Sequence, residues 1–301
     1  MTTPPARHPL IAFLGAVLAI GFLSAMDAAM KTVSLAYGAF AALAWRTVIA
    51  TPLLALPYFL WRKAPPSRRA MRFHLVRGLM MVPMSFAFFY GLTYVPMAQA
   101  IALAFIAPLL ALLLAGLFLG ERVGRAIVTG SLLAFGGVLV IFFGQAQADL
   151  GRDALVGSFA ILGSALLYSV NIVLMREQSR TAGPVEVAFY YFAVSGLGFW
   201  LVALFVGAPP LPRGEPVAML LATLLAVVGM MGLAWAYARA EASYLSTTEY
   251  SGFVWGALFG FLVFGEVPSG WTLVGAGFIV AGSWIAARRR VEPGPSLEAS
   301  P

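Results

Sequence analysis

Ten long apolar runs follow one another along the chain, with short polar segments between them. About 20 helical residues cross the hydrocarbon core of a bilayer, so each run can span a membrane. A charged fraction of only 10% and a mean hydropathy of +0.91 fit lipid as the solvent. The runs lack the short alternating pattern of barrel strands. We therefore predict an all-α integral membrane protein with ten transmembrane helices, over residues 10–30, 37–60, 73–94, 98–119, 123–143, 154–175, 185–206, 217–236, 242–264 and 271–287.

The chain also contains an internal repeat. One apolar run ends in Gly-Glu at 120–121 and another ends in Gly-Glu at 265–266, which is an offset of 145 residues. The same offset aligns Gly130 with Gly275, Gly137 with Gly282, Leu113 with Leu258 and Leu117 with Leu262. We predict two five-helix units, residues 1–147 and 148–290. A disordered tail over 291–301 follows, because this segment is rich in Pro, Gly, Ser and Glu.

The Lys and Arg residues predict the orientation of the chain. With the N-terminus inside, fourteen of them fall in loops on the cytoplasmic side and only three fall in loops on the other side. Cytoplasmic loops carry such an excess, so both termini are expected in the cytoplasm. Five crossings are an odd number, so the second unit enters the membrane from the side opposite to the first. The two units are therefore predicted to be inverted repeats.

Inverted repeats have a mechanical use, because two similar bundles can exchange conformations and expose a midplane site to each face in turn. We expect a secondary transporter of a small polar or amphipathic metabolite. The alternatives are a facilitative channel-like permease, a membrane-embedded lipid-modifying enzyme, and a duplication that only built a stable bundle.

The chain lacks the residues that several classes of function require. The chain has no cysteine, no intramembrane histidine pair, no HExxH and no GxSxG, and His8 and His74 lie at polar borders. We therefore expect no catalysis, no metal and no cofactor. No ATP-binding loop is present, so transport would draw on an ion gradient or on exchange. The net charge of +7 comes from loops between runs, which argues against a nucleic-acid partner. The expected partners are a small-molecule substrate and the lipid bilayer, with a homodimer as one option for assembly.

The main ionisable residues inside apolar runs are Asp27, Arg46 and Glu249. Each costs roughly 2.5 to 3.5 kcal/mol on insertion scales, so each needs a partner or water. We expect Arg46, near the midplane, to anchor a substrate carboxylate or similar anion. Asp27 or Glu249 would bind a substrate amine or carry a coupling proton. The alternative is an internal ion pair of Arg46 with Asp27 or Glu249. Lys31 lies four residues after Asp27, so a pair between these two is expected, with Lys31 snorkelling.

Polar and aromatic residues extend this candidate site. Trp255 shares a helix face with Thr248 and Ser251, and Tyr250 follows Glu249. Such a face can stack on and hydrogen-bond a planar or cationic metabolite, although an aromatic residue in a membrane helix more often serves packing. The sixth run adds the candidates Tyr168 and Asn171, which occupy the region equivalent to Asp27.

Small residues at four-residue spacing predict close helix packing. The ninth run carries Gly252, Gly256 and Gly260, and the fourth carries Ala107, Ala111 and Ala115 at the equivalent positions. Such stripes let two backbones approach closely. We expect a close-packed seam on each helix, with the two seams meeting across a pseudo-twofold axis as one arrangement. Pro83 and Pro108 are expected to kink or loosen their helices.

The order of short motifs resembles one family. These motifs are MDAAMK at 26–31, Arg46, HLVRG at 74–78, YGLTYVPMAQA at 90–100, Pro108 and the two Gly-Glu endings. Together they make residues 10–287 similar to the bacterial ten-helix members of the drug/metabolite transporter superfamily, with two EamA-type repeats. Within it, the chain also resembles S-adenosylmethionine uptake carriers. The resemblance implies a multi-pass protein of the bacterial inner membrane that carries a small metabolite.

Overall fold

The computed structural model describes residues 9–61, 64–119, 125–147, 151–178, 181–237, 239 and 245–287. The first Gly-Glu ending, the side chain of Ala115 and the tail over 291–301 lie outside what it describes. All the regular structure within these residues is helical: α1 (Pro9–Tyr37), α2 (Ala39–Trp61), α3 (Arg68–Leu92), α4 (Met97–Ala104), α5 (Ala107–Leu119), α6 (Arg125–Gln147), α7 (Gly151–Gln178), α8 (Pro184–Val206), α9 (Pro216–Tyr237), η1 (Ser246–Tyr250), α11 (Ser251–Phe264) and α12 (Gly270–Ala287).

Ten apolar helical stretches correspond to the ten predicted runs. Within the described residues, six are long and apolar enough to cross a membrane, and four are shorter. The shorter ones are 97–111, 128–144, 248–264 and 270–285. The chain is therefore an all-helical, multi-pass membrane protein.

The fourth predicted run is broken into α4 and α5 by a turn at Phe105 and Ile106. Pro108 explains the break, because proline has no N–H to donate and its ring collides with the carbonyl of residue 104. The ninth run changes at the equivalent place, from the 3₁₀ helix η1 to the α-helix α11 between Tyr250 and Ser251. Pro83 causes no such break, since α3 stays one helix from Arg68 to Leu92.

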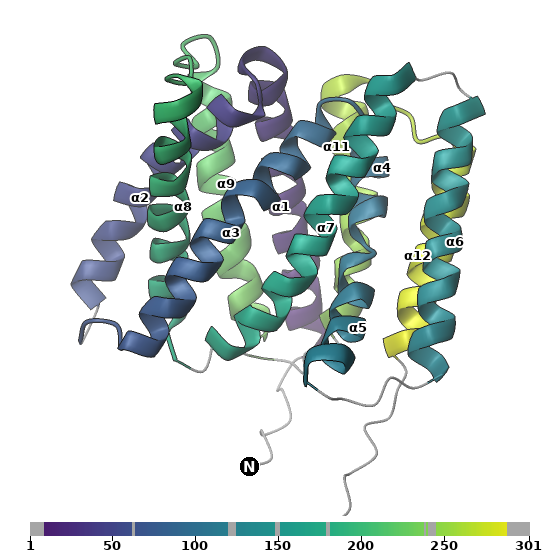
Figure 1. The fold of residues 1–301 in the computed structure, drawn as a ribbon, viewed down its shortest axis with the longest axis horizontal. Helices are drawn as coiled ribbons and strands as arrows, with labels where there is room; N and C mark the ends of the chain where they lie inside the picture. Colours follow the sequence, from purple (N-terminus) through teal and green to yellow (C-terminus); the bar gives the residue numbers. More distant parts are fainter. Residues whose placement is uncertain are drawn as a thin grey trace, which may run out of the picture.

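Helices at equivalent positions of the two units pack against each other. Figure 1 shows α2 beside α8 at one end of the long axis and α6 beside α12 at the other, with α4 and α11 between them. Each of these pairs is antiparallel. Along α2, Phe40 contacts Phe199 while Tyr58 stacks on Phe189, so rising numbers in α2 meet falling numbers in α8.

Helices α6 and α12 approach each other closely at glycine residues. A Cβ atom on Gly137 would lie 2.5 Å from the carbonyl oxygen of Gly275, and one on Gly275 would lie 2.6 Å from that of Gly137. Gly282 approaches the carbonyl of Gly130 in the same way. The 145-residue offset relates residue 130 to 275 and residue 137 to 282. It therefore turns the contact of 130 with 282 into that of 137 with 275, as at the interface of a symmetric dimer.

The glycine stripe of α11 faces α4. Ile101 lies against Gly256, and Met97 would lie 3.4 Å from a Cβ atom on Gly260. Gly252 lies beside Ile101, Phe105 and Ile20 of α1. The alanine stripe belongs to α5 instead, where Ala107 and Ala111 are buried and α5 contacts mainly α7. Because the turn at Phe105 redirects the chain, the two small-residue stripes do not face each other.

Candidate functional site

Charged and polar side chains from five helices meet inside the bundle. Asp27 comes from α1, Arg46 from α2, Arg77 from α3, Asn171 and Tyr168 from α7, and Tyr191 from α8. We call this group the central cluster. Tyr191 interacts electrostatically with Arg46, Arg77 and Asp27, and therefore lies among the charges of three helices.

Arg46 is one of the two strongly enclosed charges of the central cluster, with 6% of its surface exposed. Its Nη1 lies 3.4 Å from the sulfur of Met26, and its guanidinium carbon lies 5.3 Å from the ring centre of Phe192 and 6.0 Å from that of Phe89. No carboxylate among the described residues is within 4.0 Å of it. Asp27 acts on it electrostatically without forming an ion pair. The internal salt bridge of Arg46 is therefore not formed in this structure.

Arg77 is equally enclosed, with 6% of its surface exposed. Its Nε donates a 2.7 Å hydrogen bond to Oδ1 of Asn171, which is itself buried. Tyr168 and Tyr191 are its other electrostatic neighbours. Sequence reasoning missed both Arg77 and Tyr191 as site residues. Arg77 follows Arg72 and His74, so it reads as part of the charged border of its run.

Part of the central cluster is accessible. Tyr168 lies deep among the helices, yet it is 43% exposed, and Asp27 is half-buried. Glu249 is exposed and interacts electrostatically with Tyr168 and Tyr250. The cluster therefore combines buried cations with an accessible polar edge.

The two aromatic candidates of the ninth run make packing contacts. The indole Nε1 of Trp255 donates a 3.0 Å hydrogen bond to the carbonyl of Val17, and its ring fills the space beside Gly21 of α1. Tyr250 meets Phe105 edge to face, with ring centres 5.8 Å apart. Phe105 and Tyr250 are separated by 145 positions, so they are equivalent in the two units.

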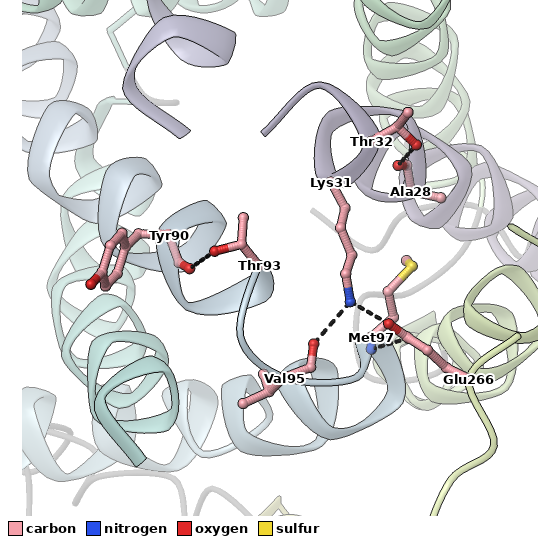
Figure 2. A network of polar contacts seen from close by, with 8 residues as sticks. All are labelled: Ala28, Lys31, Thr32, Tyr90, Thr93, Val95, Met97 and Glu266. Atoms are coloured by element: carbon pink, nitrogen blue, oxygen red, sulfur yellow. Dashed lines mark hydrogen bonds and ion pairs between the residues drawn. The ribbon is translucent and has the colours of Figure 1, made fainter. Parts of the chain in front are cut away.

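A second polar group joins the end of α1 to the other unit (Figure 2). Lys31 is 3% exposed, forms an ion pair with Glu266, and donates a 2.9 Å hydrogen bond to the carbonyl of Val95. Glu266 also accepts a 2.7 Å hydrogen bond from the backbone N–H of Met97, at the start of α4. We call these four residues the Lys31 network. The prediction that Lys31 pairs with Asp27 and snorkels is therefore wrong.

The Gly-Glu ending explains how Glu266 reaches this place. Gly265 ends α11 with a φ of 67°, a left-handed conformation that glycine adopts without strain. The backbone N–H of Gly265 bonds to the carbonyl of Phe261 at 2.9 Å, as in the αL capping motif, and that of Glu266 bonds to the carbonyl of Gly260 at 3.0 Å. A Cβ atom on Gly260 would lie 2.9 Å from Oε2 of Glu266. Glycines therefore both turn the chain and leave room for the carboxylate.

His74 forms a third polar group, between α3, α7 and α8. It is buried, its Nε2 lies 2.9 Å from Oε1 of Glu186, and its Nδ1 lies 2.8 Å from Nε2 of Gln178. Its ring stacks on Tyr190 at 4.4 Å. These contacts tie helix ends together and satisfy both ring nitrogens, which is a structural role.

One apolar cavity lies apart from the central cluster. It encloses about 350 Å³ between α5 and α6, and its lining residues are Ile106, Leu109, Leu110, Leu113, Val128, Ser131, Leu132 and Phe135. Only Ser131 is polar, so the cavity offers a charged metabolite no partner. The central cluster is the better candidate for binding a polar substrate.

Ten apolar helical stretches define a class, the multi-pass membrane proteins. The chain belongs to the EamA-like transporter family, whose pattern matches twice, over residues 10–143 and 155–288. The two matches start 145 residues apart, which agrees with the repeat in the sequence.

Named relatives support a transport role. The chain is 31% identical to the pseudopaline exporter CntI of Pseudomonas aeruginosa over 88% of this chain and 92% of that protein. It is 32% identical to the riboflavin transporter of Rhizobium johnstonii, over 72% of this chain and 70% of the relative. A solved crystal structure shares the fold, with a TM-score of 0.60 and 24% identity over 93% of this chain and 99% of the other. The protein is thus a membrane transporter.

Proposed function

We propose that the protein is a secondary active transporter that moves a small polar or amphipathic metabolite across the bacterial inner membrane by alternating access. Its two units are inverted repeats, and both termini lie in the cytoplasm. Coupling is to protons or to exchange of a second solute. The observation that carries this proposal is the antiparallel packing of equivalent helices, α2 with α8, α4 with α11, and α6 with α12. Helices related by an axis in the membrane plane must run in opposite directions.

The set of helix contacts supports the same symmetry. The contact of α1 with α9 has its counterpart in that of α7 with α3, and the contact of α2 with α9 has its counterpart in that of α8 with α3. Exchanging the units therefore maps these contacts onto each other. In a carrier of this kind each unit can adopt the conformation of the other, which would move access from one face to the opposite face.

The Lys31 network has a place in this cycle. By the distribution of Lys and Arg, the end of α1 lies on the non-cytoplasmic face. There the network connects α1, the start of α4 and the end of α11, so it joins both units. It would hold this face closed, and opening would require Lys31 and Glu266 to separate.

Relatives support the size and polarity of the substrate. Their names refer to export of pseudopaline, transport of riboflavin and, for a relative in Streptantibioticus cattleyicolor described as probable, export of a terminal-alkyne amino acid. These are small metabolites of different chemistry. The family scaffold therefore indicates transport, while the side chains of the site determine the cargo.

Reconstitution tests this function. Purified protein in proteoliposomes would be given labelled amino acids, riboflavin, S-adenosylmethionine and cationic drugs, with and without a pH gradient. We expect saturable movement of at least one compound that responds to the gradient or to the same compound on the far side. Protein-free liposomes are the control. Stepwise conductance in planar bilayers, without saturable exchange, would contradict the carrier and favour a channel.

A further inference from the structure

The two arginines of the central cluster have unused hydrogen-bond donors. A guanidinium carries five N–H donors. Arg46 uses one of its donors on a thioether sulfur, which is a weak acceptor, and Arg77 uses one on Asn171. No described carboxylate lies within 4.0 Å of either guanidinium. Buried charges are stable only with a partner of opposite charge or with many hydrogen bonds. Among the described residues, both arginines therefore lack an anionic partner, which a bound substrate can supply.

The charges of the site indicate what that substrate carries. Its most enclosed charges are the guanidinium groups of Arg46 and Arg77, and the carboxylate of the half-buried Asp27 acts on Arg46 electrostatically. Glu249 is exposed at the edge of the site, where it interacts electrostatically with Tyr168. A molecule with two carboxylates and one ammonium group would match each of these three groups with an opposite charge.

We propose that the substrate is an amino acid with two carboxylates. This inference rests on the proposed transport function and names the substrate class of the same site. One carboxylate binds Arg46, the other binds Arg77, and the ammonium group binds Asp27. Tyr191, which interacts with all three charges, offers its hydroxyl to a carboxylate. Phe89 and Phe192, which flank Arg46, cover the carbon chain.

Arg77 is the residue that sets specificity in this arrangement. Arg46 binds the carboxylate that every amino acid has, whereas Arg77 binds the second one. An amide in that position has no charge to pair with the guanidinium and turns an N–H₂ group toward it. A hydrogen bond to a charged group is worth more than one between neutral groups. We therefore expect discrimination of about tenfold or more against the amide.

Matched pairs of ligands test the proposal on the unmodified protein. Binding of aspartate, glutamate and 2-aminoadipate would be measured by calorimetry on the purified transporter, beside asparagine, glutamine and glutarate. At least one dicarboxylic amino acid should bind about tenfold tighter than its amide, and glutarate, which lacks the amine, should also bind more weakly. Equal binding of every acid and its amide, or binding of none of the acids, would overturn the proposal.

A variant assigns the second carboxylate to its residue. Arg77→Gln should weaken binding of the dicarboxylic amino acid about tenfold or more, and should leave the affinity for its amide within about threefold. Arg152→Gln removes an exposed arginine at the start of α7 and should change neither. An equal loss for acid and amide in Arg77→Gln would show that Arg77 only maintains the structure, and would overturn its assignment.

The substrate class and the transport function can fail separately. Exchange of a neutral or cationic metabolite in proteoliposomes, without preference for a dicarboxylic amino acid over its amide, would overturn the substrate class and leave transport in place. Tight binding of glutamate without any exchange across the bilayer would support the site and overturn the transport function.

Discussion

Loss of the Glu266 charge should open one face of the protein. Lys31 has 4% of its side chain exposed and Glu266 has 19%, so their pair is largely buried. Glu266→Gln keeps the size of the side chain and leaves Lys31 as a buried cation without its counterion. Breaking a buried pair from one side costs about 3 to 5 kcal/mol. Because Glu266 is partly exposed, we expect a cost near the lower end of this range, about 3 kcal/mol. This cost corresponds to a roughly 100-fold shift toward the open state.

The chain lacks cysteine, so a single introduced thiol reports this shift directly. Ser34→Cys is suitable because Ser34 is 3% exposed and lies one helical turn after Lys31. Its rate of reaction with a membrane-permeant maleimide should follow the open fraction and rise up to about 100-fold in Glu266→Gln. Ala70→Cys, at a buried position near the start of α3, is the matched control, because it reports labelling in another part of the protein.

Two results would refute this reasoning. A labelling rate at Ser34→Cys within twofold of the parent would mean that the pair does not hold the face closed. An equal rise at Ser34→Cys and at Ala70→Cys would mean that the whole protein has become less stable. The double variant Lys31→Met with Glu266→Gln no longer has an unpaired buried charge, so its labelling and melting temperature should return toward those of the parent.

Other predictions concern packing and the central cluster. Gly137→Ala should destabilise the protein by about 1 to 3 kcal/mol in thermal melts, because its Cβ meets a carbonyl, whereas Gly136→Ala, with open space around it, should be neutral or slightly stabilising. Trp255→Phe removes one hydrogen bond to a carbonyl, so it should cost about 1 kcal/mol in the same melts without changing substrate preference. Arg46→Ala should weaken substrate binding at least tenfold in calorimetry, since it removes a buried cation. Glu249→Gln should reduce proton-driven transport in proteoliposomes; unchanged transport in both of these variants, at equal membrane levels, would contradict the site.

The sequence predicted the parts of the fold that depend on composition and local chemistry. The apolar runs follow from the length that a bilayer requires, and the break before α5 follows from the missing N–H of Pro108. The change from η1 to α11 was not predicted. Its segment holds no proline, and Phe253 stands at the position that matches Pro108. Tertiary packing, including the contact of Tyr250 with Phe105, accompanies that change.

The candidate site was predicted in part. Asp27, Arg46, Tyr168 and Asn171 were singled out, and the structure brings them together with two residues that were not. The partner of Lys31 was missed for a physical reason. Helical spacing identifies neighbours three or four residues away, whereas Glu266 lies 235 residues further along the chain.

The contact between Phe105 and Tyr250 has a consequence for the energetics of transport. Two equivalent residues that touch must lie close to an axis that relates the units, so under the proposed alternating access this contact would keep its place while the units exchange conformations. The rings differ by one hydroxyl group, which only Tyr250 supplies. Two identical units would give inward-open and outward-open states of equal free energy. The hydroxyl group at this contact is one of the differences between the units that would remove that equality and give the transporter a preferred resting side.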